Sequence, residues 1–392
     1  VDVAIVGGGP AGLYAGQLLA ERGLRTRVRE EHERIGEPVH CTGIVGAELF
    51  DLPGVPGDAV VARPSAARFH SPAGLQLDYA GPADEVCVVD RGAFDRGLAA
   101  AAGRAGAEIA TGSRVLRLAI GPDRVTVHWV EAARAHSVRA RVCVLACGAS
   151  YGFQRQLGWG IPALHLAAAQ TELEAATDDT LDVFLRADLA PRGFGWLVPI
   201  RRAGESRAKV GVMAARGARS LLARLEEDLR KAGRVSGAPG LVAARPLPLG
   251  PLARTYGDRV MAIGDAAGLV KPTTGGGIYY RLLSARWAVE TLAEAFGRGD
   301  FTERVLGGYQ ETWQARLGLE LSVGLWFRRL TTRLTPADLD ALTELALTDG
   351  VIPVVRRTAR FNWHRELIVG TLRHPGVLRI VLRRLVAARI SA

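Results

Sequence analysis

Three glycines near the start of the chain constrain its fold more than any other feature. Gly7, Gly9 and Gly12 have the spacing G-x-G-x-x-G and directly follow the short apolar run 1–6. Residues 11–22 then carry apolar side chains at helical spacing and stop at a glycine. A buried strand, a glycine turn and a helix in this order are typical of a Rossmann-like unit that binds a dinucleotide.

Each glycine has its own predicted role in that unit. Gly7 permits the tight turn, Gly9 lets the backbone approach a pyrophosphate, and Gly12 lets the helix pack close to the strand. The helix N-terminus presents free N–H groups and a positive dipole end to the phosphates. Glu30 ends a second predicted strand at 26–30, where a carboxylate can accept hydrogen bonds from the adenosine ribose.

A second glycine-rich segment, late in the chain, indicates FAD as the cofactor and not NAD alone. Asp265 follows a predicted strand at 259–263 and can accept hydrogen bonds from the ribityl hydroxyls. A helix predicted at 279–296 follows a glycine run, and its positive end can stabilise a reduced flavin. Before a third helix, predicted at 94–105, an arginine can reach the flavin or its phosphates. The residues expected to bind this part of FAD are Arg91, Asp265, Gly275, Gly276, Gly277 and Ile278.

With these pieces the sequence resembles the large FAD-dependent superfamily of aromatic hydroxylases, halogenases and prenyl reductases. Residues 31–44, EHERIGEPVHCTGI, are similar to the segment after the ribose-binding acid in the geranylgeranyl reductase family. Residues 194–199, FGWLVP, are similar to that family's second motif, with Val198 in place of the usual Phe. The resemblance covers most of residues 1–300.

The resemblance implies a reaction and a set of site residues. Geranylgeranyl reductases use FAD to saturate isolated double bonds of isoprenoid chains. An isoprenoid lipid or prenyl diphosphate is therefore the implied substrate, with NAD(P)H or a ferredoxin-like protein as external electron donor. Cys41 is implied beside the flavin and Trp196 as a catalytic wall of the substrate channel. Gly43, Phe194 and Pro199 are implied to line that channel.

Two positions depart from the family pattern. Lys209 stands where the family has the first glycine of a G-x-G pair, of which only Gly211 is present. Cys147 and Gly148 replace an Asp-Gly pair that helps the hydroxylase branch to order both FAD and the nicotinamide donor. The second departure argues against an NADPH-driven hydroxylase and leaves the donor of a reductase open.

Two alternative functions remain open. One is an aromatic monooxygenase or halogenase on the same fold, because the segment around Trp196 also resembles the halogenase tryptophan motif. The other is a flavoprotein that binds nucleic acid through a basic C-terminal tail. The tail aromatics Phe361 and Trp363 are too few and too close together for a stacking platform, so we expect no nucleic-acid partner.

The charge distribution favours a surface role for the C-terminus. Residues 351–392 carry nine arginines against the single acid Glu366 and supply most of the net charge of +10. Such a segment favours either an anionic membrane surface or a solvated helix face. Arginines interrupt its apolar runs, so we expect no transmembrane helix. Four scattered cysteines without a CxxC pair predict no metal site and fit a cytoplasmic protein, with peripheral membrane attachment left open.

The whole pattern predicts an α/β protein with two interleaved domains and a helical end. A Rossmann-like FAD-binding domain is expected over 1–60, 85–160 and 245–305. A β-rich substrate domain is expected over 61–84 and 161–244, and a C-terminal helical region over 306–392. Within the β-rich domain, strands are predicted at 181–185, 195–200 and 209–214, and an amphipathic helix at 220–232.

Overall fold

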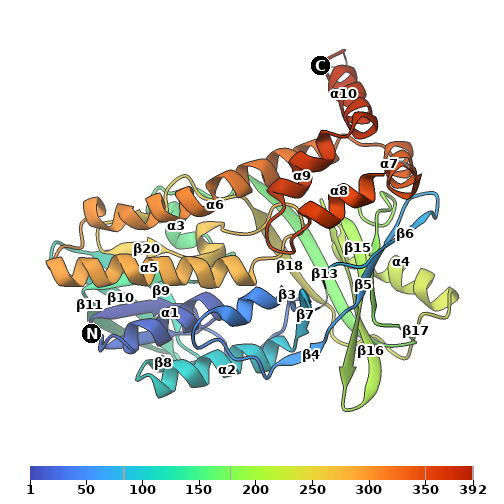
Figure 1. Ribbon diagram of the computed structural model, residues 1–392. Coiled ribbons are helices and arrows are strands. Elements are labelled where there is room, and N and C mark those ends of the chain that lie inside the picture. Colours follow the sequence, from blue (N-terminus) through green and yellow to red (C-terminus); the bar gives the residue numbers. More distant parts are fainter. Residues whose placement is uncertain (83, 177, 349, 391–392) are drawn as a thin grey trace.

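The molecule is built around two sheets that lie at opposite ends of Figure 1. The computed structural model describes residues 1–82, 84–176, 178–348 and 350–390, and the side chains of 386–390 lie outside the described part. One sheet is mainly parallel, the other mainly antiparallel, and the C-terminal helices run along the upper edge of the view. This arrangement confirms the predicted α/β fold class with a C-terminal helical region.

The parallel sheet contains the glycine motif. Its strands are β1 (Val3–Val6), β2 (Thr26–Arg29), β8 (Glu108–Ala110), β12 (Val142–Leu145), β19 (Tyr256–Gly257) and β20 (Val260–Ala262), and its helices are α1 (Pro10–Ala20), α2 (Arg91–Arg104), α3 (Gly152–Gln156) and α5 (Ile278–Arg298). The strand order is β19-β20-β12-β1-β2-β8, with only β19 antiparallel to its neighbour. Every residue of β1 and β12 is buried, as expected for central parallel strands. Helix α1 packs against α2 and α5, and the ends of these helices differ from the predicted ones by a few residues.

Two small antiparallel sheets extend this layer. They comprise β9 (Arg114–Ile120), β10 (Val125–Glu131) and β11 (Arg134–Ala140) in one, and β3 (Ile44–Gly46), β4 (Val60–Ala62) and β7 (Val86–Val89) in the other. Short 3₁₀ helices η1 (Ala47–Asp51) and η2 (Gly264–Ala267) follow β3 and β20. The meander β9–β11 packs on β12 and was not predicted from the sequence.

The large sheet combines two distant stretches of chain. Its strands are β5 (Ala66–His70), β6 (Gln76–Tyr79), β13 (Leu164–Ala175), β14 (Thr180–Phe184), β15 (Phe194–Arg202), β16 (Glu205–Ala214), β17 (Val235–Ser236) and β18 (Ala243–Leu249), and α4 (Ala218–Lys231) packs on it. The order is β17-β13-β16-β15-β14-β5-β6, and β18 also pairs with β13. From the predicted segment 61–84 the large sheet takes β5 and β6, whereas β4 belongs to another sheet; the boundary predicted after residue 244 falls inside β18.

Strand alternation gives the large sheet two different faces. Leu197 of β15 and Val210 of β16 belong to a buried core with Leu222 and Leu225 of α4. Successive side chains of a strand point to opposite faces, so the neighbours of these residues in β15 and β16 point away from α4. Trp196 is among those neighbours, and we call its side of the sheet the inner face.

The C-terminal region is helical from residue 303. It consists of α6 (Glu303–Thr331), α7 (Pro336–Thr348), α8 (Val351–Thr358), α9 (Arg365–Leu372) and α10 (Pro375–Ile390). Leu330, Val351, Val377 and Val381 form a small core that joins α6, α8 and α10. Among the described residues, no helix combines the length and the apolar character needed to cross a bilayer.

A buried carboxylate on α7 anchors the last helix. Asp338 is fully buried and accepts hydrogen bonds from Arg383 (2.7 Å to Nη2), from Arg384 and from the backbone N–H of Thr335 (2.9 Å). Burial alone would raise the pKa of Asp338, but these hydrogen bonds outweigh it and hold the pKa well below its usual range. Two arginines of the basic tail therefore hold α10 on α7.

The substitution Asp338→Asn should loosen α10. Both arginine partners of Asp338 reach solvent, so the loss of stabilising free energy should be near the low end for hydrogen bonds to charged groups, about 1 kcal/mol. Amide exchange across 375–385 should consequently be about fivefold faster. Because the folded pKa is depressed, this contribution is complete above the unfolded value of about 3.9 and disappears as the pH falls below it.

The control is Asp340→Asn on the same helix. Asp340 accepts hydrogen bonds from Ser71 Oγ (2.6 Å) and from the Ala73 backbone (2.8 Å), and so ties α7 to the β5–β6 turn. Exchange mass spectrometry should find α10 unchanged in this variant. Equal α10 protection in Asp338→Asn and the unmodified protein would contradict the anchor.

Candidate functional site

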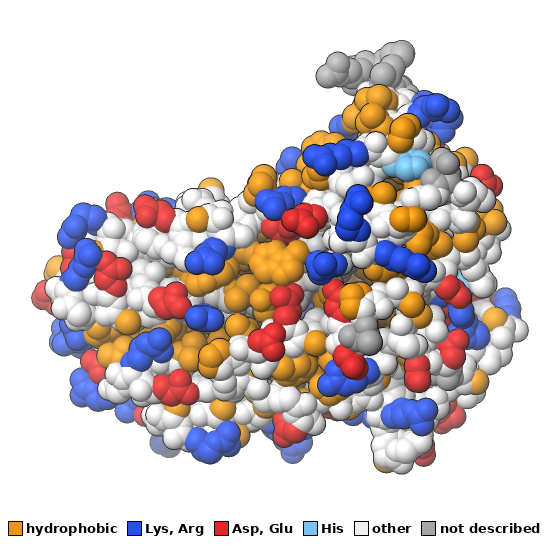
Figure 2. All heavy atoms as spheres, in the orientation of Figure 1, with side chains coloured by type: hydrophobic (Ala, Val, Ile, Leu, Met, Phe, Trp, Pro, Cys, Tyr) orange, Lys and Arg blue, Asp and Glu red, His pale blue; other side chains and the backbone are white. Residues whose placement is uncertain are grey.

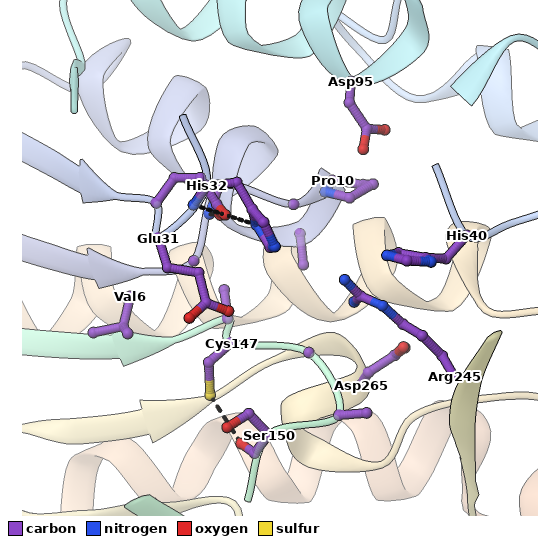
Figure 3. Close-up of a pocket in the computed structure, with 18 of the residues that line it drawn as sticks. Val6, Pro10, Glu31, His32, His40, Asp95, Cys147, Ser150, Arg245 and Asp265 are labelled. Carbon is purple, nitrogen blue, oxygen red and sulfur yellow. Dashed lines mark hydrogen bonds and ion pairs between the residues drawn. The ribbon is translucent and has the colours of Figure 1, made fainter. Parts of the chain in front are cut away.

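A cavity of about 460 Å³ lies at the carboxyl ends of the parallel strands. This is where open α/β sheets bind their ligands. Figure 3 shows that its walls come from segments far apart in the chain. The lining includes the glycine motif, residues 29–32 at the end of β2, residues 36–41, and part of β18. Of the predicted site residues, those at the cavity are Gly7, Gly9, Glu30, Cys41, Arg91 and Asp265.

The glycine motif has the close approaches that its spacing predicts. Gly7 has φ of +109°, and a Cβ there would lie 2.4 Å from the Ala146 carbonyl oxygen. A Cβ on Gly12 would lie 2.0 Å from the Gly7 carbonyl oxygen. At Gly9 a Cβ would meet nothing within 4 Å, so this side of the turn opens into the cavity. Gly9 also precedes α1, whose first N–H groups face the same space.

The carboxylate of Glu30 is fixed at the cavity wall. Its Oε2 accepts a hydrogen bond from the Gly8 backbone (2.6 Å), and its Oε1 accepts one from the His32 backbone (3.0 Å). The His32 ring also contacts Oε1, at 2.5 Å from Nδ1. Glu30 thus links the glycine turn to the end of β2, and its contact with a ribose stays a prediction.

The second glycine segment forms a different arrangement from the one expected. Asp265 lies in η2 after β20 and binds Arg281 through two contacts, Nε–Oδ1 of 2.5 Å and Nη2–Oδ2 of 2.7 Å. Arg281, one turn into α5, also lines the cavity and was missed in the sequence. A basic residue a few positions after the glycine run is the sequence feature that could have indicated it.

The glycine run itself starts α5, as predicted. A Cβ on Gly275 would lie 2.4 Å from the Leu247 side chain. Gly276, Gly277 and Ile278 line a smaller cavity together with Lys271. Asp265 therefore lines the large cavity. The start of α5 lines the smaller cavity and lies next to Arg281 and Leu247.

Cys41 lies in a positive environment. Arg91 hydrogen-bonds Asp95 through Nη2, at 2.9 Å from each carboxylate oxygen, and also contacts the Cys41 thiol. Burial would raise the pKa of Cys41, but the charges of Arg91 and Arg281 and a hydrogen bond from Gly43 outweigh it and lower the pKa. Arg91 thus lies between a carboxylate and a thiol at the cavity, and its reach to the flavin or its phosphates stays a prediction.

The predicted channel residues divide between the two faces of the large sheet. Phe194 and Trp196 lie on the inner face with ring centroids 5.9 Å apart. A Cβ on Gly211 would lie 2.2 Å from the Trp196 ring, so a glycine is required there. Pro199 lies two residues after Leu197 on β15, so both side chains point to the α4 side of the sheet. The structure therefore does not bring Pro199 together with Trp196.

Segment 41–43 touches the inner face. Thr42 Oγ1 donates a hydrogen bond to Gln170 Oε1 of β13 at 2.8 Å. Gln170 pairs with Gly211, which in turn pairs with Trp196 on β15. A Cβ on Gly43 would lie 2.3 Å from the Val89 carbonyl oxygen, so this turn also needs a glycine. The contact connects the cavity to the aromatic part of the sheet.

Polar atoms in the cavity fit a bound nucleotide. Both ring nitrogens of His40 are buried and have no hydrogen-bond partner among the described residues. Burial, the Arg245 charge and other nearby positive groups lower the pKa of His40 to about 4, so the ring is neutral at pH 7. Figure 3 shows His40 and Arg245 close together on one wall. An anionic group with hydrogen-bonding edges would satisfy both the imidazole and the guanidinium.

Comparisons with known proteins agree with this geometry. Residues 1–232 match a family model described as an FAD binding domain. A protein named digeranylgeranylglycerophospholipid reductase 2 of Methanopyrus kandleri is 31% identical over 374 residues, or 91% of this chain and 92% of that one.

Two solved structures share the fold. A geranylgeranyl bacteriochlorophyll reductase-like protein of Thermoplasma acidophilum superposes with a TM-score of 0.84 at 22% identity, covering 98% of each chain. The p-nitrophenol 4-monooxygenase PnpA of Pseudomonas putida superposes with a TM-score of 0.74 at 17% identity, covering 95% of this chain and 98% of that one. At these identities the superpositions show the fold alone.

Cys41 should be the fastest of the four cysteines to react with iodoacetamide at pH 8. Its neighbours favour the reactive thiolate, whereas burial raises the pKa of Cys87 and Cys143, and that of Cys147 to about 11. Peptide mass spectrometry over time gives the rate at each site. Faster labelling of Cys147, which also borders the cavity, would contradict this environment.

Proposed function

Since the chain belongs to the FAD-binding domain family and to the family of the digeranylgeranylglycerophospholipid reductases, we propose that it is an FAD-dependent oxidoreductase that saturates isolated C=C bonds of a geranylgeranyl-type chain. The observation that carries the proposal is the contact of segment 41–43 with the inner face of the large sheet. It supports a site in which the segment that carries Cys41, at the cavity, adjoins the aromatic surface of the large sheet.

Different residues of the chain would bind different parts of FAD. Gly7, Gly9 and the N-terminus of α1 would hold the pyrophosphate, and Glu30 would accept hydrogen bonds from the ribose. Asp265, paired with Arg281, would accept hydrogen bonds from the ribityl hydroxyls. When bound, FAD supplies the hydride equivalent that an alkene needs. We propose NAD(P)H or a ferredoxin-like protein as the external donor.

The inner face supplies an apolar surface for the isoprenoid. Phe194 and Trp196 are adjacent on β15, and Met213 pairs with Phe194 on the neighbouring strand. An isolated alkene has no polar group by which to be oriented, so apolar contact has to position it and exclude water. Cys41 can hold the proton that the second alkene carbon needs at its Sγ, where Arg91 accommodates the thiolate that remains.

Mass spectrometry of the product tests the reaction. Dithionite-reduced enzyme should convert a geranylgeranyl compound into products heavier by about 2 Da per double bond, because each saturation adds a hydride and a proton. Cys41→Ala should lower the rate about 10²-fold or more, as expected for loss of a general acid, and weaken FAD binding much less. A product that gains oxygen would move the assignment to an aromatic monooxygenase.

The control is Gly9→Arg. The space beside Gly9 is open, so an arginine fits without a backbone clash and occupies the place of the pyrophosphate. This variant should fold, remain colourless and form no product. A variant that keeps its flavin would show that the dinucleotide lies elsewhere.

We further propose that α9 and α10 attach the enzyme to an anionic membrane surface, where isoprenoid lipids reside. Leu378 and Leu382 are one turn apart on α10 and exposed (41% and 49%). Arg373 and Arg379 are exposed nearby, and Figure 2 shows hydrophobic and basic side chains side by side over these helices. The structure changes the set of arginines available: Arg383 and Arg384 bind Asp338, and the Arg389 side chain lies outside the described part.

Vesicle sedimentation tests this attachment. Anionic vesicles at low salt should sediment the enzyme, whereas neutral vesicles should not. Changing Arg373 and Arg379 to Gln should weaken binding about 25-fold, at about 1 kcal/mol for each charge. Changing Leu378 and Leu382 to Ser should weaken it further. Leu241→Ser, at a 98% exposed leucine in another part of the molecule, is the control and should bind normally.

A further inference from the structure

A buried lysine stands against the turn that carries the proposed catalytic thiol. Lys209 of β16 is only 4% exposed, and its Nζ donates hydrogen bonds to the carbonyl oxygens of Thr42 (2.7 Å) and Val89 (3.4 Å). A Cβ on Gly43 would lie 3.4 Å from the same nitrogen. Thr42 directly follows Cys41, so the amine lies against the turn that presents the thiol to the cavity.

Holding two carbonyl groups does not by itself require a lysine. A neutral amide such as glutamine could donate to both oxygens, without the free-energy cost of burying a charge. An ammonium group has three N–H donors, and two of those on Lys209 are directed to Thr42 and Val89. The third donor and the positive charge need another explanation.

The charged groups around Lys209 leave Cys41 as its counterpart. Glu172 of β13 binds Arg202 (2.8 Å) and Arg207 (2.9 Å), and Asp90 also binds Arg202. These acids are therefore already neutralised by arginines. Burial lowers the pKa of Lys209 to about 8, and the strongest opposing influence is the negative charge of a Cys41 thiolate. The lysine pKa is therefore lowered by burial, and the thiol pKa is lowered by the positive charges around it.

The groups that face Cys41 come from three other elements. Arg91 of α2 contacts the sulfur, and Arg281 of α5 adds a second permanent positive charge. Asp95 binds Arg91 and Asp265 binds Arg281, so each of these arginines also faces a carboxylate. His40, the preceding residue, is neutral at pH 7 because its pKa is lowered. Arginine does not titrate in this range, so Lys209 is the neighbour that can give up a proton.

We propose that Lys209 is a positioning residue that controls the protonation of Cys41, stabilising its thiolate and returning a proton to the sulfur between turnovers. The role in turnover rests on the proposed function, whereas the coupling of the two groups does not. In the step, the S–H bond breaks and its electron pair stays on sulfur. The proton forms a C–H bond with the π electrons of the alkene, and the other carbon would receive the hydride equivalent that bound, reduced FAD would supply.

The return of the proton completes the cycle. One N–H bond of Lys209 breaks, its electron pair stays on nitrogen, and the S–H bond of Cys41 forms again. The neutral amine then takes a proton from water. Lys209 can serve in this way only while its ammonium form is populated, which holds below about pH 8.

The test is the pH profile of Cys41 alkylation by iodoacetamide in the flavin-loaded enzyme. Loss of the positive charge in Lys209→Met should shift the thiolate midpoint upward by about one pH unit, because an adjacent cation favours the thiolate. Lys231→Met is the control, since Lys231 pairs with Glu227 on the surface of α4. Its profile should match that of the unmodified protein.

A second variant keeps the test decisive if Lys209→Met loses flavin. Lys209→Arg carries a charge that does not titrate, so its profile should keep a low midpoint and lose the inflection near pH 8 that coupled titration produces. An unshifted midpoint in flavin-loaded Lys209→Met, or an inflection that persists in Lys209→Arg, would overturn the proposal. Neither measurement needs a prenyl substrate, so failure to reduce one would affect the proposed function alone.

Discussion

The hydrogen bonds around Thr42 join the two halves of the site, and its geometry depends on them. The side chain of Thr42 binds Gln170 and its carbonyl oxygen accepts a hydrogen bond from Lys209, both from the large sheet. On the other side of this turn, Cys41 contacts Arg91 of the nucleotide-binding layer. One short segment therefore sets the distance between the cavity and the inner face, and a shift of it would separate the thiol from both.

Local sequence patterns predicted the parts of the site that depend on neighbours in the chain. The turn at Gly7 and the start of α5 follow from backbone sterics, and Glu30 follows from its place at the end of β2. The pairing of Asp265 with Arg281 and the contact of Lys209 with Thr42 arise from folding distant segments together. No local rule contains those contacts, although the basic residues themselves were visible.

The channel and the tail show the same limit in another form. FGWLVP was interpreted as one motif, but alternation along β15 sends Trp196 and Pro199 to opposite faces. The sequence shows correctly that arginines outnumber acids in the tail, but this count does not show which arginines form ion pairs. Asp338, 45 residues before Arg383, determines which arginines are paired. Burial and partnership are properties of the fold, and composition alone does not define them.

The interleaving of the chain has a consequence for how the protein is made. The large sheet needs β5 and β6 as well as β18, so it cannot close until residue 249 has left the ribosome. The parallel sheet needs β20 at 260–262 beside β12. Pairings with such large sequence separation form slowly because a long loop has to close first. During synthesis, edge strands of both sheets therefore stay unpaired until roughly two thirds of the chain is available. Until then, neither sheet can fold as an independent unit.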